Sequence, residues 1–229
     1  MNMLLVAMIL LQEKTVEQTF KKIEETLERA TSVQVKFRVE GKATQGERRT
    51  TYMGTGFLAL RGKDCFHLTC SSKQTSGGKD DLDDVRIVSD GKQMFFSSGE
   101  RKWIWEASND FSIARFKGNL LRLGAWRTAW LADTYGVLAT EAIGMSDFRE
   151  GPKSDRGSTL KFATKYRTER FSDEVHQSET LLEYEAETFK LLGRRVVFGA
   201  DASMNETYEA FTLNADIPDR MFKLPKDGK

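Results

Sequence analysis

The chain has 229 residues, of which 39% are hydrophobic and 30% charged, and its formal net charge at pH 7 is +1. This composition is typical of a globular protein with one substantial core. A nearly neutral chain has no net field that would attract nucleic acid or an anionic membrane, so neither is expected as a partner. No Pro-rich or Gly/Ser-rich stretch divides the chain, and we expect residues 15–229 to form a single domain.

Residues 3–11 form an apolar run that is shorter than the about 20 residues needed to span a membrane. The functional interpretation of residues 1–14 is a signal peptide or disordered N-terminus, which predicts an exported, soluble periplasmic protein without a transmembrane span in the mature chain. No Lys or Arg precedes the run, and no small-x-small cleavage site follows it before Gln12. The alternative is that the run extends the helix that follows.

Two periodic segments come next. From Thr15 the apolar residues recur at helical spacing, which predicts an amphipathic helix with the buried face Val16, Phe20, Ile23, Leu27 and Ala30. From Ser32 to Lys42 the period changes to two, which predicts a strand with one buried face formed by Val33, Val35, Phe37 and Val39.

The middle of the chain is rich in strand and turn signals. Residues 50–71 contain two β-rich runs, and the polar stretch between Ser71 and Asp84 is expected to be an exposed loop. The turn signals Asp90-Gly91 and Ser98-Gly99 divide residues 85–106 into three antiparallel strands. Residues two apart share a face there, and the two apolar pairs are Met94 with Phe96 and Trp103 with Trp105.

Residues 111–135 have apolar positions near helical spacing, and Gly118 and Gly124 are expected to break the segment into short helices. It is interpreted either as a lid over a sheet or as a helix packed in the core. The candidate lid residues are Ile113, Phe116, Leu120, Trp126 and Trp130.

Period-two alternation returns at residues 160–167 and 182–187, and two further strands are expected at 194–200 and 206–215. In total about 9–11 strands are expected. Short connections between successive strands favour an antiparallel sheet that curls into a barrel or half-barrel over a helix, in a mainly β protein with helices.

Catalytic chemistry has little support in the sequence. His67 and His176 stand outside any nucleophile or metal-ligand motif, and no phosphate-binding glycine loop is present, so neither catalytic residues, nor a metal, nor a cofactor is predicted. Cys65 and Cys70 are expected to lie about 16 Å apart on opposite faces of one strand, which excludes a disulfide between them.

An ordered set of segments resembles a known family. The N-terminal helix is followed by SVQVKF, GTGFLALR, RIVSDGKQMFF and a terminal DRMFKLPKDG. In this order they resemble the outer-membrane lipoprotein carrier family, LolA, and its wider LolA/LolB-like superfamily. The resemblance implies an unclosed antiparallel β-barrel of which helices cover the apolar concave face, and it implies that this face shields the acyl chains of a lipoprotein. The family's strand-end arginine, which helps to hold the helical lid, falls on Arg61.

Burial of an acyl chain contributes about 0.8 kcal/mol per CH₂ group, so an apolar wall can hold a chain without a polar anchor. The candidate lipid-binding residues are Val35, Phe37, Val39, Phe57, Ala59, Arg61, Met94, Phe96, Trp103 and Trp105. The alternative is that the apolar members of this set are simply a filled core.

Three functions follow from these observations. The leading hypothesis is a non-enzymatic periplasmic carrier or binding protein for lipid or acylated lipoprotein. The second is an envelope sensor or protein-binding module on the same fold, with an envelope protein as its partner. The third is a small-molecule enzyme, which would need a cleft with titratable groups that the sequence does not indicate.

Overall fold

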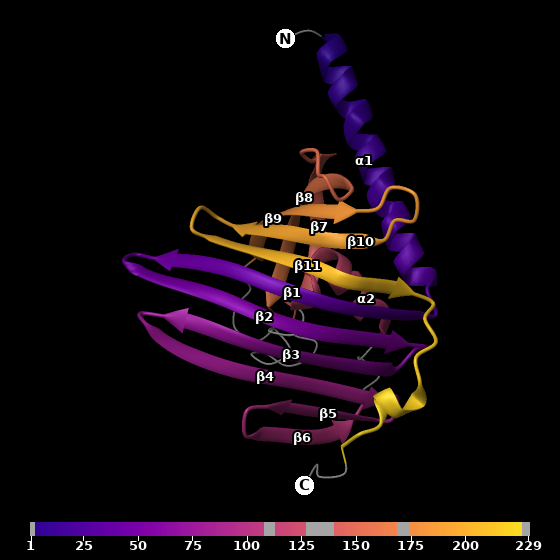
Figure 1. Ribbon diagram of the computed structural model, residues 1–229. Coiled ribbons are helices and arrows are strands. Elements are labelled where there is room, and N and C mark those ends of the chain that lie inside the picture. The colour runs from indigo at the N-terminus through magenta and orange to yellow at the C-terminus, as the bar shows by residue number, and fades with distance from the viewer. Residues whose placement is uncertain (1–2, 108–112, 127–139, 169–174, 226–229) are drawn as a thin grey trace.

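One antiparallel sheet of 11 strands dominates the computed structural model, which describes residues 3–107, 113–126, 140–168 and 175–225. The strands are ordered β6-β5-β4-β3-β2-β1-β11-β10-β9-β8-β7, so nearly all neighbours in space are neighbours in sequence. Within the described residues the two end strands, β6 and β7, do not pair with each other, and the curved sheet stays open (Figure 1). This confirms the prediction of an unclosed, mainly β structure.

The strands are β1 (Ser32–Gln45), β2 (Arg48–Arg61), β3 (Cys65–Ser76), β4 (Lys79–Asp90), β5 (Gln93–Ser98), β6 (Arg101–Glu106), β7 (Thr140–Glu150), β8 (Ser158–Thr168), β9 (Val175–Tyr184), β10 (Leu191–Phe198) and β11 (Ala202–Leu213). The helices are α1 (Met3–Arg29), α2 (Ile113–Arg122) and the short 3-10 helix η1 (Asp219–Phe222). No helix in the described part of the chain is long and apolar enough to cross a membrane.

Helix α1 buries the face that the sequence predicts, because all five of its periodic apolar residues from Val16 to Ala30 are buried. Its Phe20 ring lies 5.0 Å from that of Phe162 on β8 and 5.4 Å from that of Phe148 on β7. The helix is continuous from Met3 and its first turns extend beyond the sheet (Figure 1). A continuous helix is what the alternative interpretation of the N-terminus expects, and the export function of this run stays a prediction.

The face of the sheet that α1 and α2 cover, called the inner face from here on, carries the main core. Phe37 on β1 is fully buried there, and its ring lies across Gly56, the residue opposite it on β2. A Cβ atom on Gly56 would be 2.2 Å from the Phe37 ring. The glycine therefore makes the room that the phenylalanine fills.

The stretch from Ser71 to Asp84 is not the predicted exposed loop. It forms the outer halves of β3 and β4, which pair through to Ser76 and Lys79 and turn at Gly77-Gly78 with φ angles of +58° and +77°. Lys73 forms an ion pair of 2.6 Å with Asp80 across this hairpin. Strand pairing satisfies the backbone without burial of the polar side chains, so a hydrophilic composition did not exclude strands here.

A second, smaller core lies on the opposite face, the outer face. The segment after β11 crosses that face at the ends of β2 to β4, where Ile217 and Phe222 are buried against Ala59 (Figure 1). Ser32 Oγ donates a hydrogen bond of 2.6 Å to the Ala215 carbonyl at the start of the crossing. The C-terminal segment therefore closes one end of the outer face.

Substitution of Gly56 by Ala is expected to destabilise the protein by about 1–3 kcal/mol, because the added methyl group overpacks a site where the Phe37 ring cannot withdraw. Gly144→Ala is the matched control, since no atom lies within 4 Å of a Cβ on this strand glycine, and its effect should stay within about 0.5 kcal/mol. Urea unfolding followed by tryptophan fluorescence measures both. Equal stability of the two variants would contradict this account of the inner face.

Candidate functional site

Five of the predicted wall residues are brought together on the inner face. Val35, Phe37 and Val39 follow one another along β1, and Met94 and Phe96 lie on β5, four strands away. All five are buried in the main core beneath the helices. In this arrangement the wall is packed with side chains, as the filled-core alternative expects.

Phe57 and Ala59 lie on the other face of the sheet, which corrects their assignment to the wall. Antiparallel pairing sets Phe57 opposite Lys36 and Ala59 opposite Gln34, and directly paired residues share a face. The inner-face residues of β2 are instead Leu58 and Leu60, which are fully buried in the main core. Because residues 57–60 are all apolar, the period of this run did not reveal which pair points inward.

Arg61 holds the C-terminal segment and not the lid that the resemblance implied. Its guanidinium donates a hydrogen bond of 2.6 Å to the Ile217 carbonyl and forms an ion pair of 2.6 Å with Asp219. The guanidinium carbon also lies 4.8 Å from the centre of the Phe222 ring. These contacts stabilise the cover of the outer face.

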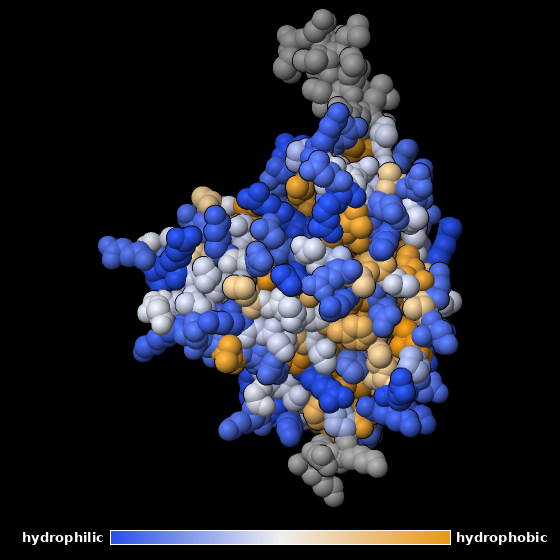
Figure 2. Space-filling view, in the orientation of Figure 1, coloured by the Kyte–Doolittle hydropathy of each residue, from blue (hydrophilic) through white to orange (hydrophobic). Residues whose placement is uncertain are grey.

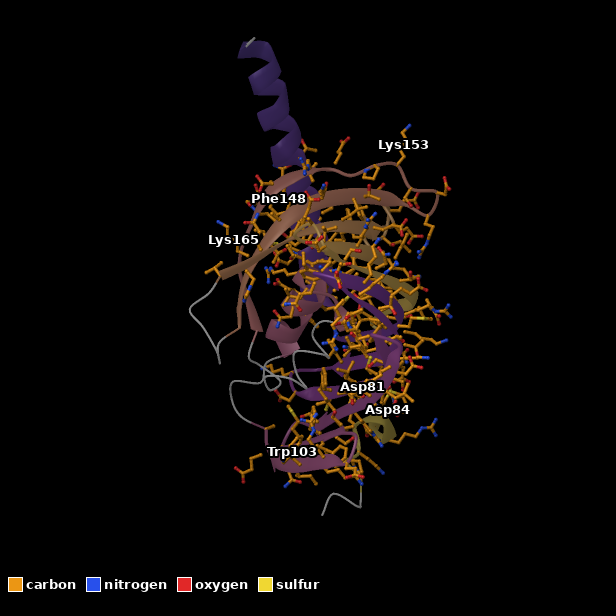
Figure 3. All side chains as sticks on the ribbon, turned by 90° about the vertical axis from the view of Figure 1, so that its left-hand side faces the viewer. Asp81, Asp84, Trp103, Phe148, Lys153 and Lys165 are labelled. Carbon is orange, nitrogen blue, oxygen red and sulfur yellow. The ribbon has the colours of Figure 1, made fainter. Side chains whose placement is uncertain are left out.

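The two wall tryptophans lie on β6, at the end of the sheet. Trp103 is paired with Phe96, and their ring centres are 5.0 Å apart. Trp103 nevertheless remains 47% exposed, which makes it the accessible margin of the inner face. Figure 3 shows it at the β6 end of the molecule, with Phe148 at the other end. Trp105 pairs with Met94, and its side chain lies outside the described part of the structure.

The predicted lid corresponds to helix α2 and the residues that follow it. Leu120 and Trp126 are buried in the main core, and Trp126 packs against Gly54 of β2, whose Cβ would lie 3.0 Å from the indole. Gly118 lies inside the helix, whereas Gly124 ends it with a φ of +91°. The side chains of Ile113 and Phe116, and the whole of Trp130, lie outside the described residues.

Arg194 of β10 fixes the C-terminal end of α2 to the sheet. The side chain is buried, and Nη2 donates a hydrogen bond of 2.8 Å to the Arg122 carbonyl. Nη1 donates bonds of 3.3 Å to the carbonyls of Leu120 and Leu121. The last carbonyls of a helix lack partners within the helix and carry partial negative charge, so a buried guanidinium is a suitable partner for them.

Glu206 of β11, directly opposite Arg194, holds the chain just beyond the helix. Its carboxylate accepts hydrogen bonds of 2.6 Å from the Trp126 N–H, 3.2 Å from the Ala125 N–H and 3.0 Å from the Tyr208 hydroxyl. Burial raises its pKa above the ordinary value, although Arg194 and these hydrogen bonds act in the opposite direction. Arg194 and Glu206 together are called the lid clasp.

Gly124 fits between the two halves of the lid clasp. A Cβ on this residue would lie 2.3 Å from Glu206 Oε2 and 2.9 Å from Arg194 Cδ. The positive φ and the close approach both require glycine. The chain therefore leaves the helix at the point where the two charged groups hold it.

Two cations of α2 bind α1 on the other side of the lid. Lys117 is buried, and its ammonium donates hydrogen bonds of 2.6 Å to the Ala30 carbonyl and 3.2 Å to the Glu28 carbonyl. Burial lowers the pKa of Lys117, while the nearby Glu28 raises it. Arg122 forms an ion pair with Glu24. Polar contacts thus join α2 to both of its neighbours.

The lid clasp was missed in the sequence. A charged residue at a position where the period of a strand predicts burial is a weak signal of a buried charge. Glu206 is such a residue, because Tyr208, two residues later, lies on the same face of the strand. Nothing in a single sequence indicates that Arg194 lies opposite it, because strand order and register decide that contact.

The titratable residues singled out in the sequence are structural where they are described. His67 Nδ1 lies 2.6 Å from the Met221 carbonyl, and burial lowers the pKa of this histidine. Cys70 is buried, which raises the pKa of its thiol, and both cysteines are free. Within the described residues no group of three or more His, Cys, Asp or Glu side chains could hold a metal ion.

No protein-family model and no curated protein matches the sequence. Among solved structures, LprF from Mycobacterium bovis is 10% identical with a TM-score of 0.42, over 90% of this chain and 95% of its own. A β-barrel-like DUF1849 protein from Brucella abortus is 7% identical with a TM-score of 0.37, over 81% and 98%. A DUF1329 family protein from Desulfovibrio piger is 9% identical with a TM-score of 0.36, over 93% and 97%.

These similarities are too low to carry a functional assignment. The fold is assigned from the structure itself: an open antiparallel sheet, an N-terminal helix and a short helix over the inner face. This is the open, helix-covered arrangement that the resemblance of the ordered segments implied.

Arg194→Met is expected to destabilise the protein by about 3–5 kcal/mol, because it leaves Glu206 buried without its opposite charge and three helix carbonyls without a donor. Arg149→Met is the matched control. Arg149 forms an exposed ion pair with Glu179, and its loss should cost no more than about 1 kcal/mol. Hydrogen exchange should accelerate in α2 of the first variant only; unchanged protection of α2 would show that the clasp does not hold the lid.

The raised pKa of Glu206 predicts a pH dependence. Because the folded protein binds this proton more tightly than the unfolded chain, the contribution of Glu206 to stability is fully present below the ordinary carboxyl pKa of about 4.5 and is lost as pH rises through the folded value. Urea unfolding between pH 4 and 8 should therefore show the wild type losing stability relative to Glu206→Gln as pH rises. Parallel profiles of the two proteins would refute the raised pKa.

Proposed function

We propose that the protein is an exported, LolA-like binding protein that shields the acyl chain of a lipid or lipoprotein between the inner face of its sheet and helix α2. The observation that carries this proposal is an apolar sheet face covered by a helix that polar groups attach both to the sheet and to α1. The protein acts without catalysis or a cofactor, and its working location is the periplasm.

Polar attachment suits a lid that opens. When α2 leaves the sheet, water can replace the hydrogen bonds from Arg194 to α2, from residues 125–126 to Glu206 and from Lys117 of α2 to the Ala30 carbonyl. The net cost is modest, since folding exchanges such bonds with water. An acyl chain that enters then replaces the apolar contacts of Leu120 and Trp126, at about 0.8 kcal/mol per buried CH₂ group. The polar contacts therefore set the closed position, and the ligand compensates for the lost apolar burial.

A second candidate function is protein binding at the β6 edge. Trp103 and Ile104 are 47% and 38% exposed on an edge strand, where an added strand from a partner could pair with the backbone. Such a partner would use both faces of β6. Acyl binding uses the inner face alone, so neighbouring residues on β6 distinguish the two functions.

The decisive experiment compares Trp103→Glu with Ile104→Glu. These residues are consecutive on one strand and point to opposite faces, and both are exposed enough for the variants to fold. Native mass spectrometry with an N-palmitoylated peptide should show uptake by the wild type and by Ile104→Glu, and uptake weakened about tenfold or more in Trp103→Glu, since a charge would be placed at the entrance.

The controls separate the alternatives. A non-acylated peptide of the same sequence should not bind. Absence of palmitoyl uptake by the wild type refutes the acyl-binding function, and peptide binding that is independent of the palmitoyl group and lost in both variants supports the protein-binding function instead.

A further inference from the structure

A basic pocket lies on the outer face, away from the lid. It is about 350 Å³ in volume and lies between β1, β2 and the β10–β11 hairpin. Lys42, Arg49 and Arg195 contribute three cations from three strands, and the hydroxyl-bearing residues Thr44 and Ser203 also line it. In Figure 1 these hairpins lie at the left, and this part of the outer face is predominantly hydrophilic in Figure 2.

The register explains why these side chains converge. Arg49 is opposite Thr44, and Lys42 is opposite Ser203, so all four project from the same face of the sheet. Neighbouring strands are about 4.8 Å apart, so β10 and β1, with β11 between them, are about 10 Å apart. The long side chains of Arg195 and Lys42 can therefore approach one bound group from both sides.

Within the part of the chain that the structure describes, the three cations have no protein partner. None of the three side chains forms an ion pair or hydrogen bond with another described residue, whereas Lys36, Arg38 and Lys161 on the same face do. Lys36 and Arg38 bind Glu209, and Lys161 binds Glu179. Because no ion pair neutralises these three side chains, a bound anion would add contacts to them and would not have to displace a protein carboxylate.

The pocket is also fixed in shape. The Thr44 N–H donates a hydrogen bond of 2.9 Å to the Asp201 carbonyl, which joins the β10–β11 hairpin to β1 at the edge of the pocket. The Asp201 side chain is the one acidic group of the lining, so the net charge of the lining is two positive units. That charge matches a phosphate monoester, which carries about −1.5 to −2 at neutral pH.

We propose that Lys42, Arg49 and Arg195 form a binding site for a phosphate monoester group on the outer face. The group can belong to a small soluble ester or to the headgroup of a lipid. The site is separate from the acyl-binding face, so it stands or falls independently of the function proposed above.

The test uses Arg195→Gln, with Arg38→Gln as the matched control. Arg38 is an exposed arginine on the same face but lies outside this pocket and has Glu209 as its partner. Calorimetric titration with glycerol 3-phosphate at low ionic strength should show saturable binding to the wild type and the control. Binding to Arg195→Gln should be about tenfold weaker, because a charge-assisted hydrogen bond is lost.

Vesicles distinguish the two sources of the phosphate group. Binding to vesicles of phosphatidylcholine with phosphatidic acid, lost in Arg195→Gln and absent with phosphatidylcholine alone, assigns the site to a lipid headgroup. Binding of glycerol 3-phosphate without vesicle binding assigns it to a soluble ester. No saturable binding of either, or equal weakening in Arg38→Gln and Arg195→Gln, overturns the proposal.

Discussion

The position of helix α2 depends on a buried guanidinium and a buried carboxylate that bind the backbone of the helix and of the residues after it. Arg194 and Glu206 are 5% and 3% exposed, so their removal from water is costly. The cost is offset only when backbone groups of α2 and of residues 125–126 occupy the correct positions. An all-apolar contact would hold the helix in several registers with similar energy. Arg194 and Glu206 form their hydrogen bonds in one register only.

The two faces of the sheet have different roles because each is covered by a different part of the chain. The inner face is covered by helices joined to it through polar groups, and the outer face is closed at one end by residues 214–222 with Arg61 as the tie. An arginine at the end of β2 therefore supports the C-terminal segment, and the role of holding the lid is carried by an arginine on β10. The sequence resemblance indicated Arg61, whose contacts lie on the outer face. The arginine that binds α2 is Arg194, on the inner face.

Periodicity predicted the parts of the fold in which one face is apolar and the other polar. Helix α1 and β1 satisfy that condition, and their buried residues were identified correctly. The condition fails on β2, where residues 57–60 are apolar on both faces because both faces are covered. In the outer halves of β3 and β4 both faces carry polar residues, so there was no alternation to recognise and the composition suggested a loop. Strand β7, which pairs with two irregularities, was not identified.

Strand register places the two neighbouring arginines of the β10–β11 hairpin on opposite faces of the sheet. Arg194 and Arg195 are consecutive, so one points inward to the lid and the other outward to the basic pocket. A slip of one residue would exchange them and place the lid-binding guanidinium in solvent. Gly193 opposes such a slip, since it packs so closely on β11 that a Cβ would lie 2.9 Å from the Glu206 carbonyl oxygen. Any residue with a side chain brought to that position would separate β10 from β11, so the same glycine keeps both arginines on their faces.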